Sequence, residues 1–220
     1  MVEDCTGLCI NAQCINGLVS FWRFEGSAND EMGKNDGTII GAEWAEGKSG
    51  QALEFDVANN DRVTVSSPSN LPTGNHTTVI AWIKPDTTQD DPDYNGIFSY
   101  GSRYCDYTSL VLAINEDGVP VLDTWCNSFW ADSLNVNFDS WNFIAGVVNE
   151  SSVILYVNEQ KETGTFSNPP NINTGLLNIG ATDDNPGGRN FNGIIDEVMI
   201  FNRSLGESEI QEIYGYFIGA

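Results

Sequence analysis

The 220-residue chain carries 31 acidic and 9 basic residues, a formal net charge of −22 at pH 7. A surface this acidic repels the phosphates of nucleic acids and anionic lipid head groups, so neither is an expected partner. Hydrophobic residues make up 40% of the sequence, which suits a globular core. The sequence contains no run of about 18 apolar residues, the length that a membrane-spanning helix needs. The acidic excess fits calcium sites, a salt-rich habitat or a generally solvated surface.

Residues 1–16 form a short lead that contains three of the five cysteines, Cys5, Cys9 and Cys14. Three cysteines so close together suggest one disulfide and one unpaired thiol. A zinc site is the alternative, but a fourth ligand is missing nearby. We expect residues 17–220 to form a single domain, because no internal repeat or Pro-rich linker interrupts them.

After the lead, the chain consists of short apolar stretches separated by Gly, Asn, Asp or Pro. They are rich in Val, Ile, Phe, Trp and Tyr, and their spacing is typical of an all-β sandwich or barrel. The expected strands are residues 18–24, 52–55, 63–65, 77–83, 96–100, 110–114, 141–148, 153–157, 176–179 and 194–201. One helix is expected over residues 207–214, with Gly206 as its N-cap and Glu209 reaching back to it.

Two strand-like segments, residues 108–114 and 119–125, flank the turn sequence NEDG at 115–118. Asp-Gly between apolar runs is a strong hairpin signal. Cys105 and Cys126 lie nearly equidistant from this turn, so they could face each other and form a disulfide. The alternative is a pair of buried thiols in a reducing cytosol. The disulfide instead predicts a secreted or cell-surface protein.

Several segments follow one another in the order that a known family shows. They are GLVSFWRFEG (17–26), NDGT (35–38), GQALEFD (50–56), VTV (63–65), TVIAWIKP (78–85) and the closing FNGIIDEVMIFNR (191–203). Together they resemble the laminin-G-like, concanavalin A-like jelly rolls, a superfamily that includes pentraxins and many glycan-binding modules. The resemblance implies an all-β fold, an antiparallel two-sheet jelly-roll sandwich with one short C-terminal helix. Two positions depart from the family pattern: Val57 stands where Gly is usual, and Gly206 where Ser is usual.

The resemblance to pentraxins also implies a calcium site. Residues 97–101 with Asp106 are similar to the pentraxin stretch that supplies calcium ligands, and residues 180–185 lie where pentraxins place further acidic ligands. Calcium takes about six to eight oxygens from carboxylates, amides and backbone. The implied ligands are Asp106, Asp183, Asp184 and Asn185. The alternative is a pair of solvated acidic loops.

A second acidic group is another candidate for a metal. Its members are Glu25, Asp30, Asp36 and Asp196. The first and last strands of jelly rolls commonly lie side by side, so a structural calcium there would tie the chain ends together. In the alternative, Asp196 caps backbone amides or pairs with Arg203.

Aromatic residues gather in the sequence around the predicted disulfide. Tyr and Trp rings stack on the apolar faces of sugars, while carboxylates and amides bond to sugar hydroxyls. The predicted ligand-binding residues are Tyr104, Trp125, Trp130 and Arg189. Packing in the core or in a loop is the alternative for Trp125 and Trp130.

Residues suited to catalysis are scarce. The only histidine, His76, stands at a strand start, which argues against a histidine-based triad. The Glu-x-Asp-x-Glu strand pattern of glycosidases on this fold is absent, as are the Arg- and His-bearing motifs of jelly-roll lyases. We therefore expect a non-catalytic extracellular module that binds a glycan or surface glycoprotein with the help of calcium. The sequence does not indicate its oligomeric state. The alternatives are a structural component of a cell surface, pilus or virion and, less favoured, a polysaccharide hydrolase or lyase.

Overall fold

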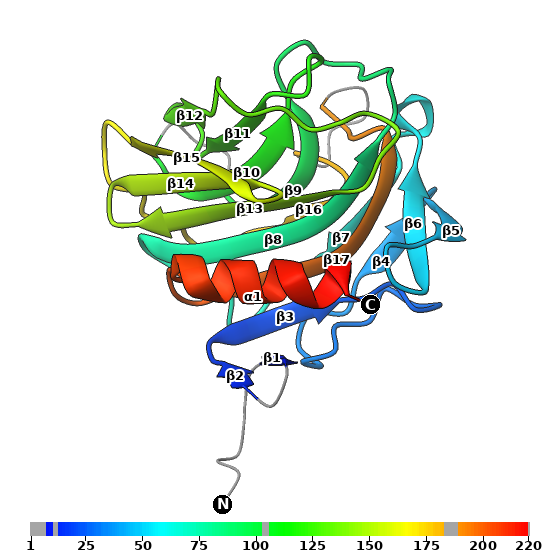
Figure 1. The fold of residues 1–220 in the computed structure, drawn as a ribbon, viewed down its shortest axis with the longest axis horizontal. Helices are drawn as coiled ribbons and strands as arrows, with labels where there is room; N and C mark the ends of the chain where they lie inside the picture. Colours follow the sequence, from blue (N-terminus) through cyan, green and yellow to red (C-terminus); the bar gives the residue numbers. More distant parts are fainter. Residues whose placement is uncertain (1–7, 11–12, 103–105, 183–188, 220) are drawn as a thin grey trace, which may run out of the picture.

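The computed structural model describes residues 8–10, 13–102, 106–182 and 189–219. Two antiparallel sheets pack face to face (Figure 1). The first sheet has seven strands. In spatial order they are β12 (Ser128–Trp130), β11 (Pro120–Asp123), β10 (Ser109–Ile114), β9 (Asn95–Gly101), β16 (Leu177–Ile179), β7 (Arg62–Val65) and β4 (Thr38–Ile40).

The second sheet has eight strands. In spatial order they are β15 (Gln160–Thr165), β14 (Ser152–Val157), β13 (Asn142–Asn149), β8 (His76–Pro85), β17 (Gly193–Phe201), β6 (Gln51–Phe55) and β5 (Glu43–Glu46), with β3 (Leu18–Trp22) paired to the later part of β17. The first and last strands of the domain therefore lie side by side, as the jelly-roll resemblance implied. Together the sheets confirm the predicted antiparallel two-sheet sandwich.

The expected strands all occur close to their predicted bounds, and the NEDG hairpin is confirmed. β10 and β11 pair with Val111 opposite Asp123. Gly118 adopts a φ of 83°, and its N–H donates to the carbonyl of Asn115 at 3.1 Å. A residue with a side chain rarely adopts this φ, so glycine suits the turn. A 3-10 turn, η1 (Val57–Asn59), begins at Val57, where the family usually has Gly.

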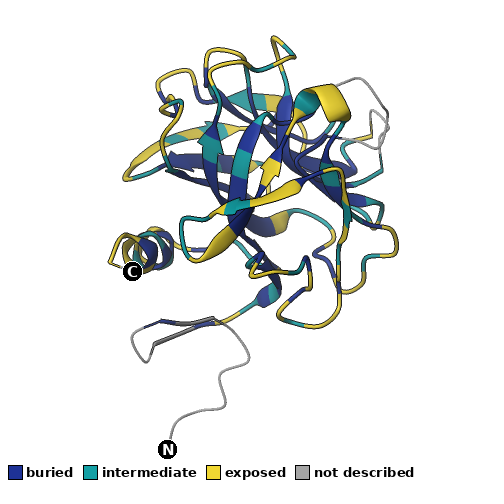
Figure 2. Cartoon of the chain, turned by 90° about the vertical axis from the view of Figure 1, so that its right-hand side faces the viewer, coloured by how far each residue is buried: buried dark blue, intermediate teal, exposed yellow. Residues whose placement is uncertain are grey.

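Apolar side chains fill two layers. One lies between the sheets and includes Trp22, Phe55 and Phe98. Figure 2 shows the buried residues concentrated on the strands and the exposed ones mainly on the loops. The other layer lies between the eight-stranded sheet and the helix α1 (Glu207–Ile218), where Trp82 contacts Phe143 edge-on at 5.6 Å between ring centres.

The described part of the lead packs onto this second layer. β1 (Leu8–Ile10) and β2 (Gln13–Ile15) form a hairpin, and Ile10 and Ile15 are buried in the same cluster as α1. The domain boundary at residue 16 stays a prediction.

The start of α1 has the expected cap. The Gly206 N–H donates to Glu209 Oε2 at 2.9 Å, and Arg203 Nη1 donates to the same oxygen at 2.8 Å. The helix continues to Ile218, beyond its predicted end at residue 214. Within the described ranges, no helix is long and apolar enough to cross a membrane.

Candidate ligand-binding site

The outer face of the seven-stranded sheet carries a small apolar patch. Side chains alternate between the two faces of a strand, so Leu110 and Leu112 point into the core between the sheets while Val111 and Ala113 point away from it. Val121 of β11 joins Val111 and Ala113, and the rings of Tyr94 and Trp130 pack against this patch. The predicted residue Trp130 therefore lies on the outer face.

Three predicted ligand-binding residues come together over this patch. The Trp130 ring lies 5.4 Å from the Tyr94 ring, centre to centre. The guanidinium carbon of Arg189 lies 4.8 Å from the centre of the Tyr94 ring and 5.9 Å from that of Trp125. Arg189 Nε also approaches Asp91 Oδ2 at 3.7 Å. We call Tyr94, Trp125, Trp130 and Arg189 the aromatic cluster.

Asp123, at the end of β11, positions this cluster. One of its oxygens accepts from the Trp125 N–H at 2.8 Å and the other from the Ser128 hydroxyl at 2.6 Å. Because Ser128 donates to Asp123, the Tyr94 hydroxyl, 2.9 Å from Ser128, is the donor to it. Burial raises the pKa of the Tyr94 phenol above its ordinary value, so this donor stays protonated.

Part of the cluster is held in an unfavourable backbone conformation. Trp125, Cys126 and Arg189 have φ values of 56°, 75° and 66°. Residues other than Gly, Asn and Asp avoid this left-handed region, which costs about 1–2 kcal/mol each. Such outliers are found most often at functional sites.

A small cavity of about 20 Å³ opens beside the Trp125 ring, enough for about one water-sized group. Its walls come from the outer faces of β9, β10 and β16 and the segment that follows β16, and they include Ser99, Ser109, Asn178 and Thr182. The Ser99 hydroxyl donates to the Ala181 carbonyl at 2.9 Å. The Ser109 and Thr182 hydroxyls are buried and have no hydrogen-bond partner in the structure. An unmade hydrogen bond of this kind costs roughly 1–3 kcal/mol.

Tyr94 belongs to the cluster but is missed by the sequence interpretation. It lies in the turn-rich segment before β9, where Asp91 Oδ1 accepts from the Tyr94 N–H at 2.7 Å. The available signal was an isolated aromatic residue within an acidic turn. That signal does not indicate proximity to the β10–β11 hairpin, because the contact depends on how the loops meet in space.

The predicted calcium ligands are only partly described. Asp183, Asp184 and Asn185 lie outside the described residues, as does the predicted ligand-binding residue Tyr104. Asp106 is exposed in the loop between β9 and β10, and its Oδ1 accepts from the Thr108 hydroxyl. Across the part of the chain that is described, no group of three or more His, Cys, Asp and Glu side chains is placed to hold a metal ion.

The predicted disulfide is also only partly described. Cys126 is exposed and disulfide-bonded. Cys105 lies outside the described residues. The Cys105–Cys126 pairing stays a prediction.

Two members of the second acidic group organise a loop. The Asp30 carboxylate accepts the backbone N–H groups of Phe21, Met32, Lys34 and Asn35 at 2.8–3.1 Å. Asp36 Oδ1 accepts the Asp30 N–H at 2.9 Å. These bonds fix the chain between β3 and β4, so the Asp36 carboxylate serves this loop.

Asp196 accepts hydrogen bonds from backbone N–H groups, which was one of the two predicted alternatives to a metal site. Its oxygens take the N–H groups of Ser49 at 3.1 Å and Glu197 at 2.8 Å, while Arg203 pairs with Glu209 instead. Glu25 lies nearby and accepts the Gln51 N–H at 3.2 Å.

Asp196 and Glu197 are both fully buried. Burial, helped by the negative charge of Glu25, raises the pKa of Asp196 to about 7 even though backbone amides oppose the shift. Burial and the neighbouring Asp196 raise the pKa of Glu197 to about 8 against the pull of Arg23, whose Nε lies 3.6 Å from Glu197 Oε1. The pair therefore takes up protons near neutral pH.

Comparison with known proteins supports the fold. The Laminin_G_3 family, described as the concanavalin A-like lectin/glucanases superfamily, matches residues 57–211. No curated protein matches the sequence. Among solved structures, domain 4 of AbnA, a GH43 extracellular arabinanase from Geobacillus stearothermophilus in complex with arabinotriose, is similar with a TM-score of 0.71 at 18% identity, covering 90% of this chain and 98% of that domain.

Two toxin domains are also similar. The binding domain of Paraclostridial Mosquitocidal Protein 1 has a TM-score of 0.68 at 15% identity, and the match covers 90% of this chain and 52% of that one. The botulinum neurotoxin serotype G binding domain has a TM-score of 0.66 at 13% identity, with 90% and 50% covered. The chain thus spans about half the length of these binding domains. At these identities the likeness shows a shared fold.

Proposed function

The chain belongs to the Laminin_G_3 family of the concanavalin A-like lectin/glucanases superfamily, and from this premise we propose that it is a non-catalytic glycan-binding module. Its ligand would lie over the aromatic cluster on the outer face of the seven-stranded sheet. The observation that carries the proposal is the pair of buried, unpartnered hydroxyls of Ser109 and Thr182 beside the Trp125 ring.

This combination suits a sugar. Tyr and Trp rings stack on the apolar face of a sugar, and the two hydroxyls can bond to one sugar hydroxyl that reaches into the cavity. The toxin binding domains and the arabinotriose-bound arabinanase domain support a binding role for this fold.

The charges around the cluster favour a neutral glycan. Among the described residues, Asp91 and Asp123 lie around the cluster with one cation, Arg189, which is already paired with Asp91. The whole protein carries a formal charge of −22. Uronates and sulfated sugars would be repelled, so we propose a neutral polysaccharide or the neutral part of a glycoprotein glycan. A secreted or cell-surface location, where such glycans occur, is part of the proposal.

Titration calorimetry with arabinotriose and a panel of neutral and acidic oligosaccharides tests the function. A neutral ligand should bind with saturation, and Trp130→Ala should weaken it by roughly 1–3 kcal/mol, or about 5- to 150-fold. Trp44→Ala is the matched control, because Trp44 is 42% exposed on β5 of the other sheet. Circular dichroism checks that both variants fold. Equal losses in both variants, or no binding to any neutral glycan, would refute the proposal.

We also propose that a calcium ion binds to the loop residues that the sequence predicts as its ligands. Asp106, together with Asp183, Asp184 and Asn185, would hold the ion through oxygen atoms, and the ion would stabilise the loops beside the aromatic cluster. Millimolar calcium should then raise the melting temperature more than NaCl of the same ionic strength, and Asp183→Asn with Asp184→Asn should abolish the difference. Identical melting curves for the two salts would mean that charge screening alone is at work.

A further inference from the structure

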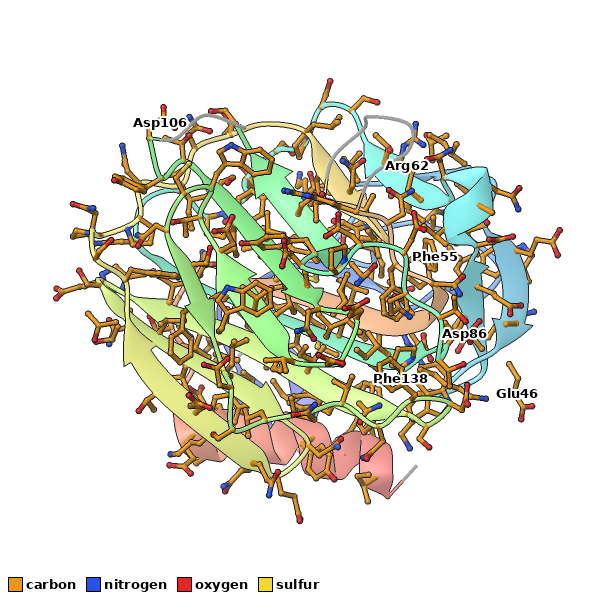
Figure 3. The ribbon with its side chains drawn as sticks, turned by 90° about the horizontal axis from the view of Figure 1, so that it is seen from above. Glu46, Phe55, Arg62, Asp86, Asp106 and Phe138 are labelled. Atoms are coloured by element: carbon orange, nitrogen blue, oxygen red, sulfur yellow. The ribbon has the colours of Figure 1, made fainter. Side chains whose placement is uncertain are left out.

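A second groove, of about 460 Å³, lies at the end of three neighbouring strands. Gly193 of β17 pairs with Phe55 of β6 and with Pro85 of β8. The residues just beyond these positions therefore meet, and Asp56, Asp86 and Asn192 all line the groove. Figure 3 shows Phe55 and Asp86 on one flank of the molecule and Asp106 on the opposite flank, so this groove lies apart from Asp106.

The groove is lined by five carboxylates. They are Glu43, Glu54, Asp56, Asp61 and Asp86. Glu43 and Glu54 stand directly opposite each other in the β5–β6 pair, an arrangement of like charges that destabilises a sheet. Among the described Lys and Arg side chains, none forms an ion pair with any of the five. The fold therefore gathers negative charge here, and no described cation pairs with it.

One of these carboxylates is buried and only half satisfied. Asp61 is 3% exposed, and its Oδ2 accepts the Asp56 N–H at 3.0 Å. Its Oδ1 is buried without a hydrogen-bond partner. This oxygen faces Gly41, another lining residue, where a Cβ atom would lie 1.8 Å from it. Gly41 and Asp61 both line the groove, so this unsatisfied oxygen belongs to the groove wall, where a ligand that donates a hydrogen bond would offset its desolvation.

The lining specifies the chemistry of the ligand. Ionised carboxylates only accept hydrogen bonds, so the ligand has to bring donors, and the clustered negative charge favours donors that are also positively charged. The groove falls within the range of about 300–1,000 Å³ typical of small-molecule sites, and the described carboxylates are not arranged to hold a bare metal ion. We propose that this groove binds a ligand with several primary amines, either a free polyamine or the lysine side chains of a peptide.

Calorimetric titrations of the folded chain with spermidine, with end-blocked trilysine and with CaCl2, all at matched ionic strength, test the proposal. At least one of the amines should bind with saturation and with a stoichiometry of one. The tighter binder of the two shows whether the groove is suited to a free polyamine or to the lysine side chains of a peptide. Glu54→Gln should weaken amine binding about 5-fold, the effect of losing one charge contact at about 4 Å in water. The same variant should melt at a higher temperature, because it relieves the Glu43–Glu54 repulsion.

Glu46→Gln is the matched control. It removes the same charge from the exposed Glu46 of β5, which does not line the groove and is labelled at the outer edge of the molecule in Figure 3. Amine affinity should stay within about 2-fold of wild type in this variant. Equal losses in both variants would reduce the effect to general surface charge and overturn the proposal, as would saturable binding of calcium alone. Glycan affinity in Glu54→Gln should be unchanged, so the outcome is independent of the proposed function.

Discussion

Arg189 places its guanidinium carbon 4.8 Å from the centre of the Tyr94 ring, although the two residues belong to different loops. Asp91 accounts for the arrangement, since its Oδ1 accepts the Tyr94 N–H while its Oδ2 lies 3.7 Å from Arg189 Nε. One acidic side chain therefore sets the positions of a ring and of the cation above it. The Arg189 guanidinium also reaches within 5.9 Å of the Trp125 ring centre, which joins the two sides of the candidate site.

Arg189→Gln should weaken glycan binding by about 5-fold, because the interaction of a cation with an aromatic face is worth about 1 kcal/mol and helps to hold both rings. Its melting temperature should change little, since half-exposed ion pairs contribute little to stability. Calorimetry and thermal denaturation provide the two measurements. Lys34→Gln, which removes an exposed cation elsewhere, should bind as wild type does; a loss of similar size there would attribute the effect to net charge.

The pairing of Cys126 can be tested directly. A digest of protein kept free of reductant should contain a peptide that links Cys126 to Cys105. Reduction should lower the free energy of unfolding by about 3 kcal/mol in the chain-entropy description. Alkylation of Cys105 in the unreduced protein would contradict the pairing and point to one of the lead cysteines as the partner.

The strands that the sequence predicts are those with a buried face. β8, β13 and β17 are nearly continuous runs of buried residues, so their apolar character is visible in the sequence. β5 and β15 were not predicted, because they lie at the ends of the second sheet and consist mostly of exposed residues. Strands at sheet edges are commonly polar, which protects them from aggregation. They form by pairing with a neighbour, and local composition does not reveal that neighbour.

The candidate site was predictable where its residues cluster in the sequence. Trp125 and Trp130 follow β10 and β11, so the hairpin motif pointed to them. The roles of Tyr94 and Thr182 depend on β9 pairing with both β10 and β16, which brings distant loops to one end of the sheet. Such long-range pairing has no local signal, so the unpartnered hydroxyl of Thr182 appears only in three dimensions.

The Asp196–Glu197 pair should make stability depend on pH. Both carboxyls bind protons more tightly in the folded state, with pKa values of about 7 and about 8, than in the unfolded chain. Their contribution to stability is therefore fully present below pH 4 and is lost as the pH rises through 7 and 8. From about pH 4 up to its folded pKa, each carboxyl contributes a slope of up to about 1.4 kcal/mol per pH unit, and the slope disappears above about pH 8.

Thermal denaturation from pH 5 to 9 measures this dependence. Asp196→Asn combined with Glu197→Gln should flatten it, because amides do not titrate. Asp90→Asn combined with Asp93→Asn is the control, since both residues are exposed and removing the same two charges there should preserve the slope. If both double variants show the wild-type slope, the buried pair is not its source.

Thr182→Val should raise stability and lower affinity at the same time. The Thr182 hydroxyl is buried without a partner, so a methyl group of similar shape should raise the free energy of unfolding by up to about 1 kcal/mol. Glycan binding should weaken by about 5-fold, because the lost hydroxyl is the one that would bond to the sugar. Ser99→Ala is the contrast within the same cavity, since Ser99 donates to the Ala181 carbonyl and its loss should lower the melting temperature. A stability loss in Thr182→Val would mean that its hydroxyl already has a partner, and an unchanged glycan affinity would place the ligand away from this cavity.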